Sequence, residues 1–287
     1  MANIREIRAR IKSVKSTQQI TKAMKMVSAA KLRRAQSGSE GMSLFARKSR
    51  EVISRLFREG MDEPLLTPHP EVKSVCYVVF VGNRGLCGTY NHTLVRYLKE
   101  LLARAEQPAS VIVVGRWGSD VIEADGIAVK ARFDDFGDLP RMEDAAHLTD
   151  YLKKLYLDGE ADEIYLVYQQ YISVLQQTPV SRLFLPLRPE EGEAAGDDYL
   201  FEPSPEAVLH SAVALYVDAA VYAVLREARI GEQASRMTAM TAATDSTAEL
   251  IDRLGLELNR ARQAAITTEI SEIVGGTNAL KSGNIHS

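Results

Sequence analysis

Residues 4–14 read IREIRARIKSV, and this stretch decides the fold expected for the N-terminal part of the chain. Its apolar side chains recur at spacings of three, four and three residues, at Ile4, Ile7, Ile11 and Val14. This spacing is typical of a coiled-coil seam, along which one helix packs against another. We expect the seam to continue more weakly at Gln18, Thr21, Met24 and Val27.

A second long helix is expected at the other end of the chain. All ten prolines lie between Pro64 and Pro205. Because proline breaks helices, the stretches of about sixty residues before them and about eighty after them can each hold a long helix. The C-terminal stretch has a seam of mostly small residues, at Met237, Thr244, Ile251, Leu254, Leu258, Ala261 and Ala265.

Glycines should limit both helices, because glycine is a poor helix former. We expect Gly38 and Gly41 to bend the N-terminal helix, which then resumes to about Arg58. In the C-terminal helix, interruptions are expected at Gly231, Gly255, Gly275 and Gly276, with the last pair ending it.

The two helices have unequal lengths. At about 1.5 Å per residue, roughly 55 residues span about 80 Å and roughly 75 residues span about 110 Å. If they pair antiparallel, the C-terminal helix extends past its partner by about 20 residues, assuming helical rise along both. The extension, around Arg262 to Val274, cannot cover its own apolar face and is expected to need a socket in another protein.

The middle of the chain alternates between strand and helix patterns. Short apolar runs indicate strands at residues 75–81, 111–114, 164–168 and 180–185, and helical patterns cover residues 91–106 and 141–157. Such alternation favours a small, mostly parallel sheet with helices on its faces. The expected fold class is therefore α/β: a long antiparallel coiled coil of the N- and C-terminal helices plus a small, mostly parallel α/β (Rossmann-like) domain. The corresponding ranges are 1–58, 72–188 and 206–276.

Charge is distributed unevenly along the chain. Residues 1–58 carry fifteen Lys and Arg against three Glu, a net charge of +12, and the rest carries 20 basic and 35 acidic groups, a net charge of −15. This separation favours an electrostatic partner for the N-terminal helix, with a merely solvated basic face as the alternative.

Several features bear on the cellular compartment. The first residues lack the apolar core of a signal peptide. We expect no membrane span, because the nearest apolar run, residues 208–225, contains His210 and Asp218. Cys76 and Cys87 have no metal-ligand spacing, which favours a reducing cytosol over a disulfide framework.

The loop GNRGLCG at residues 82–88 follows a predicted strand and precedes a predicted helix, which is where phosphate cradles are found. It lacks the Gly-Lys-Ser/Thr ending of a P-loop, so a structural turn is favoured, with Cys87 as a gap filler rather than a reactive thiol. Neither catalytic nor metal-binding residues are expected. A nucleotide- or nucleic-acid-binding α/β protein with helical arms remains the alternative function.

Four motifs in order resemble the γ subunit family of F-type ATP synthases. They are residues 4–14 with TQQITKAMKMV at 17–27, the 82–88 loop followed by Asn91, SRMTAMTAATD at 235–245, and RARQAAITTEISEIVGG at 260–276. The resemblance spans nearly the whole chain. One departure is Thr277, where the family usually has alanine, and the inserted cysteine pair of thiol-regulated chloroplast members is absent.

The resemblance implies a rotor shaft that couples ion-driven rotation of a c-subunit ring to ATP synthesis, or the reverse hydrolysis, at the β subunits. The implied partners are the α and β subunits of the catalytic ring, the ε subunit and the c ring, with neither nucleic acid nor direct membrane insertion. The chain would be a non-catalytic subunit without a cofactor, peripheral to the cytoplasmic face of the bacterial inner membrane.

The resemblance also suggests which residues carry this role. Those expected to contact the α/β ring are Met24, Lys25, Arg236, Arg262, Gln263, Thr267 and Glu269. Those expected to build the structural loop are Gly82, Arg84, Gly85 and Gly88.

Overall fold

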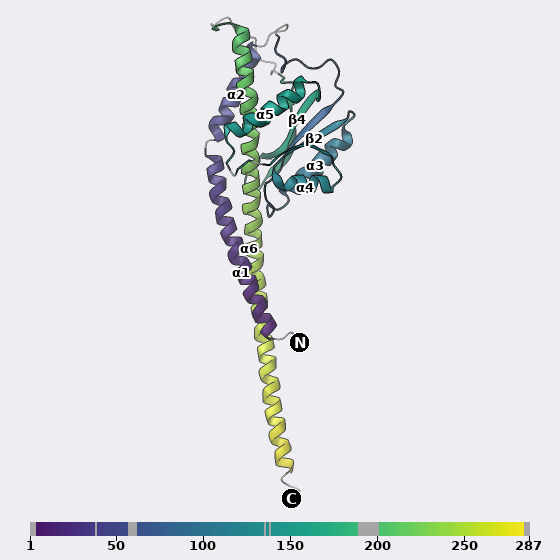
Figure 1. The fold of residues 1–287 in the computed structure, drawn as a ribbon. Coiled ribbons are helices and arrows are strands. Elements are labelled where there is room, and N and C mark those ends of the chain that lie inside the picture. Colours follow the sequence, from purple (N-terminus) through teal and green to yellow (C-terminus); the bar gives the residue numbers. More distant parts are fainter. Residues whose placement is uncertain are drawn as a thin grey trace. The chain divides into compact units, whose positions relative to one another are not determined.

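The computed structural model describes residues 4–37, 39–56, 62–134, 136–137, 139–188 and 201–283 (Figure 1). The chain forms two compact units. One, the sheet unit, comprises Val27–Ala239, and the other, the coiled-coil unit, comprises Met1–Met26 with Met240–Ser287.

The sheet unit contains a five-stranded sheet in the order β3-β2-β1-β4-β5. Its strands are β1 (Val75–Phe80), β2 (Ala109–Val114), β3 (Val129–Phe133), β4 (Glu163–Tyr171) and β5 (Gln177–Leu185). β1 pairs in parallel with β2 and β4, β2 pairs in parallel with β3, and only the edge strand β5 is antiparallel to its neighbour. The expected mostly parallel sheet is thus confirmed.

Helices cover both faces of this sheet, so every residue of the central strand β1 is buried. Along β1, Cys76, Val78 and Phe80 join the core on one face, together with α5 (Met142–Leu157) and the first part of α6 (Pro205–Gly283). The alternate β1 residues join the core on the other face, together with α3 (Tyr90–Arg104) and Ile122 of α4 (Arg116–Ala124).

The strand β3 was not predicted from the sequence. Its five residues, VKARF, are half-buried or exposed in alternation, because β3 is an edge strand that pairs with β2 alone. Such a short run with two cations lacks the continuous apolar character by which the other parallel strands were found.

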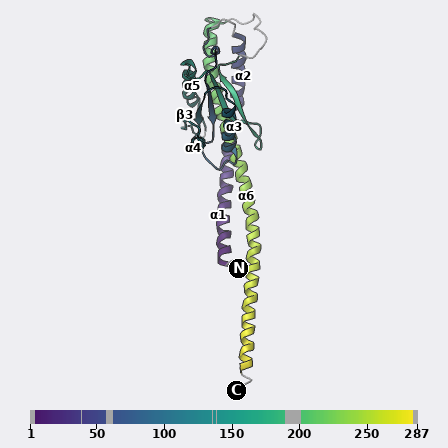
Figure 2. The same cartoon turned by 90° about the vertical axis from the view of Figure 1, so that its right-hand side faces the viewer.

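The coiled-coil unit joins the start of α1 (Ile4–Gln36) to the later part of α6. The segments run antiparallel and lie side by side in both Figure 1 and Figure 2. Ile7 and Leu254 are each 4% exposed, and the Thr244 hydroxyl donates to the Thr21 hydroxyl at 2.9 Å. The seam therefore combines buried apolar side chains with a hydrogen-bonded pair of threonines.

The observed seam departs from the expected one after Thr21. Burial along α1 next reaches Ser28, Leu32 and Ala35, whereas Val27 is 54% exposed. Thr21, Ser28 and Ala35 keep an unbroken seven-residue spacing. The expectation for Val27 was wrong because it placed an apolar side chain on the seam. The seven-residue spacing from Thr21 places Ser28 there instead.

Glycine interrupts the helices less than expected. α1 ends at Gln36 and α2 spans Ser39–Leu56, so a break lies next to Gly38, which is itself outside the described residues, but Gly41 lies inside α2. α6 is a single helix of 79 residues that contains the four glycines expected to interrupt or end it. A glycine costs a helix only about 1 kcal/mol, which a long and partly packed helix tolerates.

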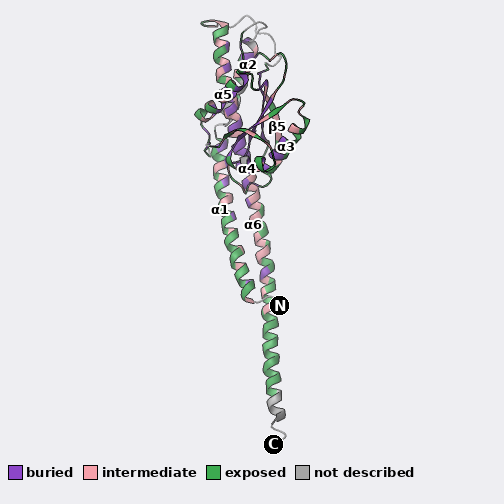
Figure 3. Cartoon of the chain, turned by 45° about the vertical axis from the view of Figure 1, so that its right-hand side comes forward, coloured by how far each residue is buried: buried purple, intermediate pink, exposed green. Residues whose placement is uncertain are grey.

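Beyond the seam, α6 continues without cover from its own chain. Residues 262–277 are all exposed, and Figure 3 shows this part of the helix in green. Four large apolar side chains there are 44% to 63% exposed, at Ile266, Ile270, Ile273 and Val274. The expected bare tip is confirmed, and Ala265, expected on the seam, belongs to it.

One window of α6 meets length and hydropathy criteria for a membrane span. Within Pro205–Thr277, 18 residues reach a mean hydropathy of 1.7, and 39% of that window is buried. The expectation that no such window exists was too strict, because it required an unbroken apolar run. A single such helix is weak support for a span, since core helices also pass, and Val213, Val217 and Val221 of α6 lie in the sheet-unit core.

Candidate functional site

The loop at residues 82–88 connects β1 to α3 and lies against α6 within the sheet unit. The Gly82 N–H donates to Asn91 Oδ1 at 2.8 Å, which ties the start of the loop to the first turn of α3. A Cβ atom on Gly82 would lie 3.1 Å from Cδ of Glu232, so a larger residue there would require the buried Glu232 side chain to shift by a few tenths of an ångström. Gly88 has a φ of 60°, in the left-handed region that favours glycine.

Two side chains of α6 bind the loop through its carbonyl oxygens. Nη2 of Arg236 donates to the carbonyl oxygens of Arg84 at 3.0 Å and Gly85 at 3.3 Å. The Ser235 hydroxyl donates to the Cys87 carbonyl oxygen at 2.8 Å. The loop backbone is thus held by the helix, which supports its assignment to structure.

A buried ionic triad lies beneath these contacts. Glu232 accepts from Arg229 at 2.8 Å and from Arg236 at 2.7 Å, one guanidinium on each carboxylate oxygen. The three residues are 5%, 3% and 7% exposed for Arg229, Glu232 and Arg236. Because a buried charge is costly unless it is paired, each member depends on the others for its place in the core.

Tyr90 of α3 forms hydrogen bonds with both α6 and β4 in the same region. Its hydroxyl donates to the Ala228 carbonyl oxygen at 2.9 Å, and its own carbonyl accepts from Gln169 at 3.0 Å. Complete burial raises the pKa of the Tyr90 hydroxyl, so the group stays a neutral donor. A Cβ atom on Gly231 would lie 3.1 Å from the Tyr90 ring, which explains a glycine in the middle of this helix.

Cys87 is buried beside the triad. Burial raises the pKa of its thiol, and Asn91 donates to its sulfur at 3.5 Å. A raised pKa keeps the thiol protonated and poorly nucleophilic, which favours the gap-filling role over a reactive one.

Part of this network was predicted from the sequence, but the ionic triad at its centre was not. The expected loop residues Arg84, Gly85 and Gly88 lie together. Arg236 was expected on a surface facing the ring. It is buried instead, and its guanidinium donates to the loop and to Glu232. Arg229 and Glu232 were not singled out. The available signal was the helical spacing of two cations around one carboxylate, with Arg229 three residues before Glu232 and Arg236 four residues after it.

The remaining expected contact residues lie in the coiled-coil unit. Met24 and Lys25 are half-buried on α1, whereas Arg262, Gln263, Thr267 and Glu269 are exposed on the tip of α6. Helical spacing places Gln263 with Thr267, and Arg262 with Glu269, on shared faces. The tip can therefore offer a guanidinium, a carboxylate, an amide and a hydroxyl to a partner, between the exposed apolar side chains.

Neither a metal site nor a phosphate cradle is apparent in the described part of the chain. Its His, Cys, Asp and Glu side chains form no group of three or more that could hold a metal ion. In the 82–88 loop, the Gly82 N–H is committed to Asn91 rather than open to a phosphate.

We therefore expect no saturable binding of ATP or NAD to the purified chain at sub-millimolar concentration. Arg84 is the only cation in the loop, and its neighbours lack the Gly-Lys-Ser/Thr arrangement that positions a phosphate-binding lysine. Isothermal titration calorimetry checks this expectation. A one-to-one site that is lost in Arg84→Ala would contradict it.

Comparison with known proteins places the whole chain in one family. Residues 3–280 match the family model described as ATP synthase. The ATP synthase gamma chain of Desulforamulus reducens is 44% identical over 98% of this chain and its own full length. The ATP synthase gamma chain of Moorella thermoacetica is likewise 44% identical over 98% of this chain and all of its own.

Solved structures share the fold of this chain. The chain resembles the rotor of the Euglena gracilis mitochondrial ATP synthase with a TM-score of 0.69 at 20% identity, covering 92% of this chain and 98% of the other. It also resembles a chain of the central stalk and c ring of the Tetrahymena thermophila mitochondrial ATP synthase. That TM-score is 0.60 at 25% identity, over 78% of this chain and 99% of the other.

Proposed function

The chain belongs to the family of ATP synthase gamma chains, and from this premise we propose that it is the central rotor shaft of an F-type ATP synthase. In that role it couples ion-driven rotation of a c-subunit ring to ATP synthesis, or the reverse hydrolysis, at the β subunits. The observation that carries the proposal is the tip of α6, residues 262–277, which stands uncovered with apolar side chains exposed.

The exposed tip fits a shaft turning in a bearing. A surface with four large exposed apolar side chains is stabilised by contact with a partner. The same tip is a single helix, so it has no threefold symmetry. Inside a ring of alternating α and β subunits it would present a different face to each β subunit, and rotation would bring each β subunit in turn into the same contact.

Charge supports the same set of partners. The net charge of +12 on residues 1–58 favours acidic surfaces on the surrounding α and β subunits. We propose that Lys25 and Met24 on α1, and Arg262, Gln263, Thr267 and Glu269 on α6, contact the ring. Arg262 suits a carboxylate because its planar guanidinium can donate two parallel hydrogen bonds.

The α/β domain is proposed to contact the ε subunit and the c ring. The chain itself would be non-catalytic, since the chemistry would take place on the β subunits. It would be peripheral, at the cytoplasmic face of the bacterial inner membrane, and held there through its partners. The division into an N-terminal coiled-coil helix at 1–58, an α/β domain at 72–188 and a C-terminal coiled-coil helix at 206–276 stays a prediction.

The substitution Met24→Lys in the assembled complex tests the proposal. The new cation can pair with a β-subunit carboxylate, and a charged hydrogen bond of about 1.5–3 kcal/mol would favour one rotational state roughly ten- to a hundredfold. We expect ATP hydrolysis to persist while ATP-driven proton pumping falls, measured together on inside-out vesicles.

Met26→Lys provides a matched control. Met26 lies on the same helix and is 60% exposed, so the substitution adds the same charge two residues away. Pumping per ATP hydrolysed should change less in Met26→Lys than in Met24→Lys. Parallel losses of hydrolysis and pumping in Met24→Lys would count against a coupling role for this position.

A further inference from the structure

Arg226 of α6 caps the C-terminal end of α1. Its Nη2 donates to the carbonyl oxygen of Ala35 at 2.6 Å and to that of Ser37 at 2.8 Å. The last four carbonyl groups of a helix have no partner within it, and the C-terminal end of a helix attracts cations. Ala35 is 3% exposed, so its carbonyl oxygen would be costly to leave without a donor. The guanidinium of Arg226 therefore stabilises a helix end that lies inside the sheet unit.

The capping guanidinium is held in place by a neighbour on α6. Tyr222 lies four residues before Arg226, which puts both side chains on one face of the helix. Nη1 of Arg226 donates to the Tyr222 hydroxyl at 3.1 Å, and the guanidinium carbon lies 5.7 Å from the centre of the Tyr222 ring. A cation that lies over an aromatic ring and bonds to its hydroxyl loses little further freedom when it binds two carbonyl groups. The donors of Arg226 are therefore oriented toward α1 in advance.

Neighbouring hydrogen bonds join the same end of α1 to β4. Nε2 of Gln36 donates to the Tyr171 hydroxyl at 3.1 Å. The Tyr171 N–H in turn donates at 3.0 Å to Glu227, the residue after Arg226. The end of α1, the end of β4 and one turn of α6 are thus connected by side-chain hydrogen bonds.

Apolar packing between α1 and α6 adds to these bonds but does not replace them. A small cluster of buried side chains joins the two helices: Leu32, Ala35, Ile230 and Ala234. Because the hydrophobic effect is non-directional, such a cluster holds α1 on α6 without fixing its position along the axis. Hydrogen bonds depend steeply on distance and angle, so those of Arg226 determine where the end of α1 lies.

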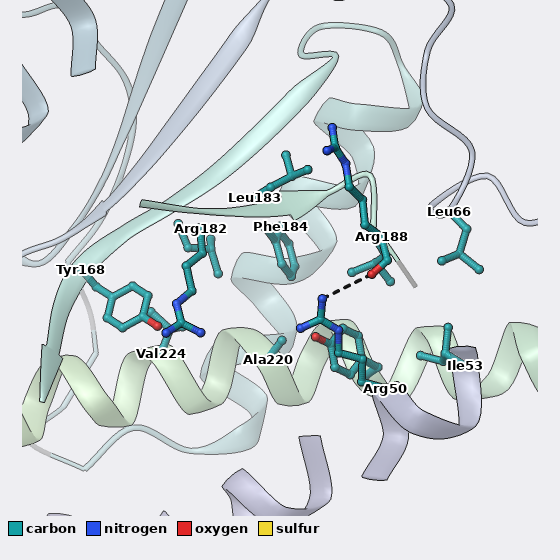
Figure 4. A pocket seen from close by; sticks show the side chains of 13 residues that line it. Arg50, Ile53, Leu66, Tyr168, Arg182, Leu183, Phe184, Arg188, Ala220 and Val224 are labelled. Atoms are coloured by element: carbon teal, nitrogen blue, oxygen red, sulfur yellow. Dashed lines mark hydrogen bonds between the residues drawn. The ribbon is translucent and has the colours of Figure 1, made fainter. Parts of the chain in front are cut away.

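A cavity borders α6 on the side away from α1. Ala220 and Val224 line this cavity, whose volume is about 330 Å³ (Figure 4). Two residues along a helix correspond to a rotation of about 200°, so Tyr222 and Arg226 lie nearly opposite to Ala220 and Val224. Dispersion contacts are missing where a cavity borders a helix, so packing alone gives little resistance to a displacement of α6 toward it. Such a displacement would draw Arg226 away from α1, and the hydrogen bonds of Arg226 oppose it.

We infer that Arg226 is a positioning residue, which fixes the axial position and the rotation of α1 and thereby the surface that α1 presents to a partner. The inference rests on the proposed rotor function, in which Met24 and Lys25 contact the ring. α1 is a single helix from Ile4 to Gln36, so a shift or rotation of its C-terminal end is carried along it to these two residues. Loss of the cap therefore loosens the coupling between rotation and ATP turnover without removing a ring contact.

Hydrogen exchange of the purified full chain tests the cap itself. Arg226→Met removes the guanidinium and keeps an unbranched apolar side chain. The backbone amides of residues 33–37 should then exchange at least about tenfold faster, the ratio that corresponds to about 1.4 kcal/mol. Tyr222→Phe keeps the ring and removes only the oxygen that holds Arg226, so it should act in the same direction with a smaller change. Arg96→Met, on the exposed surface of α3, removes a cation elsewhere and should leave these rates unaltered. Equal rates in Arg226→Met and the wild-type chain overturn the inference.

The assembled complex on inside-out vesicles tests the effect on coupling. The number of protons pumped per ATP hydrolysed should fall in Arg226→Met while ATP hydrolysis persists. A chain that was merely less stable would leave fewer complexes, so hydrolysis and pumping would fall together and their ratio would stay unchanged. An unchanged ratio in Arg226→Met, where the wild-type and Arg96→Met complexes pump normally, overturns the inference and leaves the rotor function intact. Absence of coupled pumping from the wild-type complex would instead refute the rotor function, and this inference with it.

Discussion

Replacing Glu232 by alanine is expected to lower the free energy of unfolding of the sheet unit by about 3–5 kcal/mol, the cost of removing one partner of a buried ion pair. Arg229 and Arg236 are 5% and 7% exposed, and each donates to one oxygen of the Glu232 carboxylate. Without it, two guanidinium groups stay buried with no anion between them. A loss of this size corresponds to a fall in melting temperature of roughly 6–20 °C for a unit of this length.

Thermal and urea unfolding of the purified chain measure this effect. Glu100→Ala, on the exposed surface of α3, removes the same charge and should shift stability by less than about 0.5 kcal/mol. The triple replacement Arg229→Met, Glu232→Leu and Arg236→Met should recover much of the loss, because an apolar triad avoids the desolvation of charges. Recovery should stay incomplete, since the Arg84 and Gly85 carbonyl oxygens lose their donor.

This test also separates two roles for the triad. If Glu232→Ala leaves stability unchanged, the triad does not hold the 82–88 loop to α6, and the contacts of Arg236 are incidental to the fold. If the loss occurs and the triple variant recovers, the triad acts through charge balance rather than through a unique hydrogen-bond geometry. Arg236 would then serve the loop first, and its expected contact with the ring stays a prediction.

In the isolated chain, backbone amides of the α6 tip are expected to exchange their hydrogens at least about a thousandfold faster than those of β1, given a typical global stability of 5 kcal/mol or more. The β1 residues Val75–Phe80 are buried in the middle of the sheet. The tip, residues 262–277, has only the hydrogen bonds of its own helix, and an unpacked helix of that length is marginal in water. The paired part of α6, residues 240–261, should lie between these extremes.

The assembled complex gives the second half of this prediction. Once the tip is enclosed by partners, the hydrogen-exchange rates of its backbone amides should fall by orders of magnitude, while the exchange rates of the β1 amides should change little. Mass spectrometry of exchanged peptides from the free and assembled chain compares both segments in one experiment. Uniform protection of the free chain, tip included, would show that α6 needs no partner, and the proposed shaft would lose its main structural argument.

Elements with local periodicity could be predicted from sequence. The three-and-four spacing of Ile4, Ile7 and Ile11 predicted the coiled coil, and the continuous apolar runs predicted four of the five strands. Periodicity reports which face of an element is apolar, and that face must be buried wherever the element packs. The uncovered tip also followed from sequence, because it depends only on the unequal lengths of two helices.

The tertiary structure decided what depends on residues distant in sequence. The half-exposed β3, the glycines carried inside α6 and the burial of Ser28 in place of Val27 all reflect packing partners rather than local preference. The clearest case is Arg236, which binds the carbonyl of Arg84, 152 positions away. Its sequence neighbours mark it as a helical cation, and only the fold brings it to the 82–88 loop, because pairing energy depends on distance and burial and not on position along the chain.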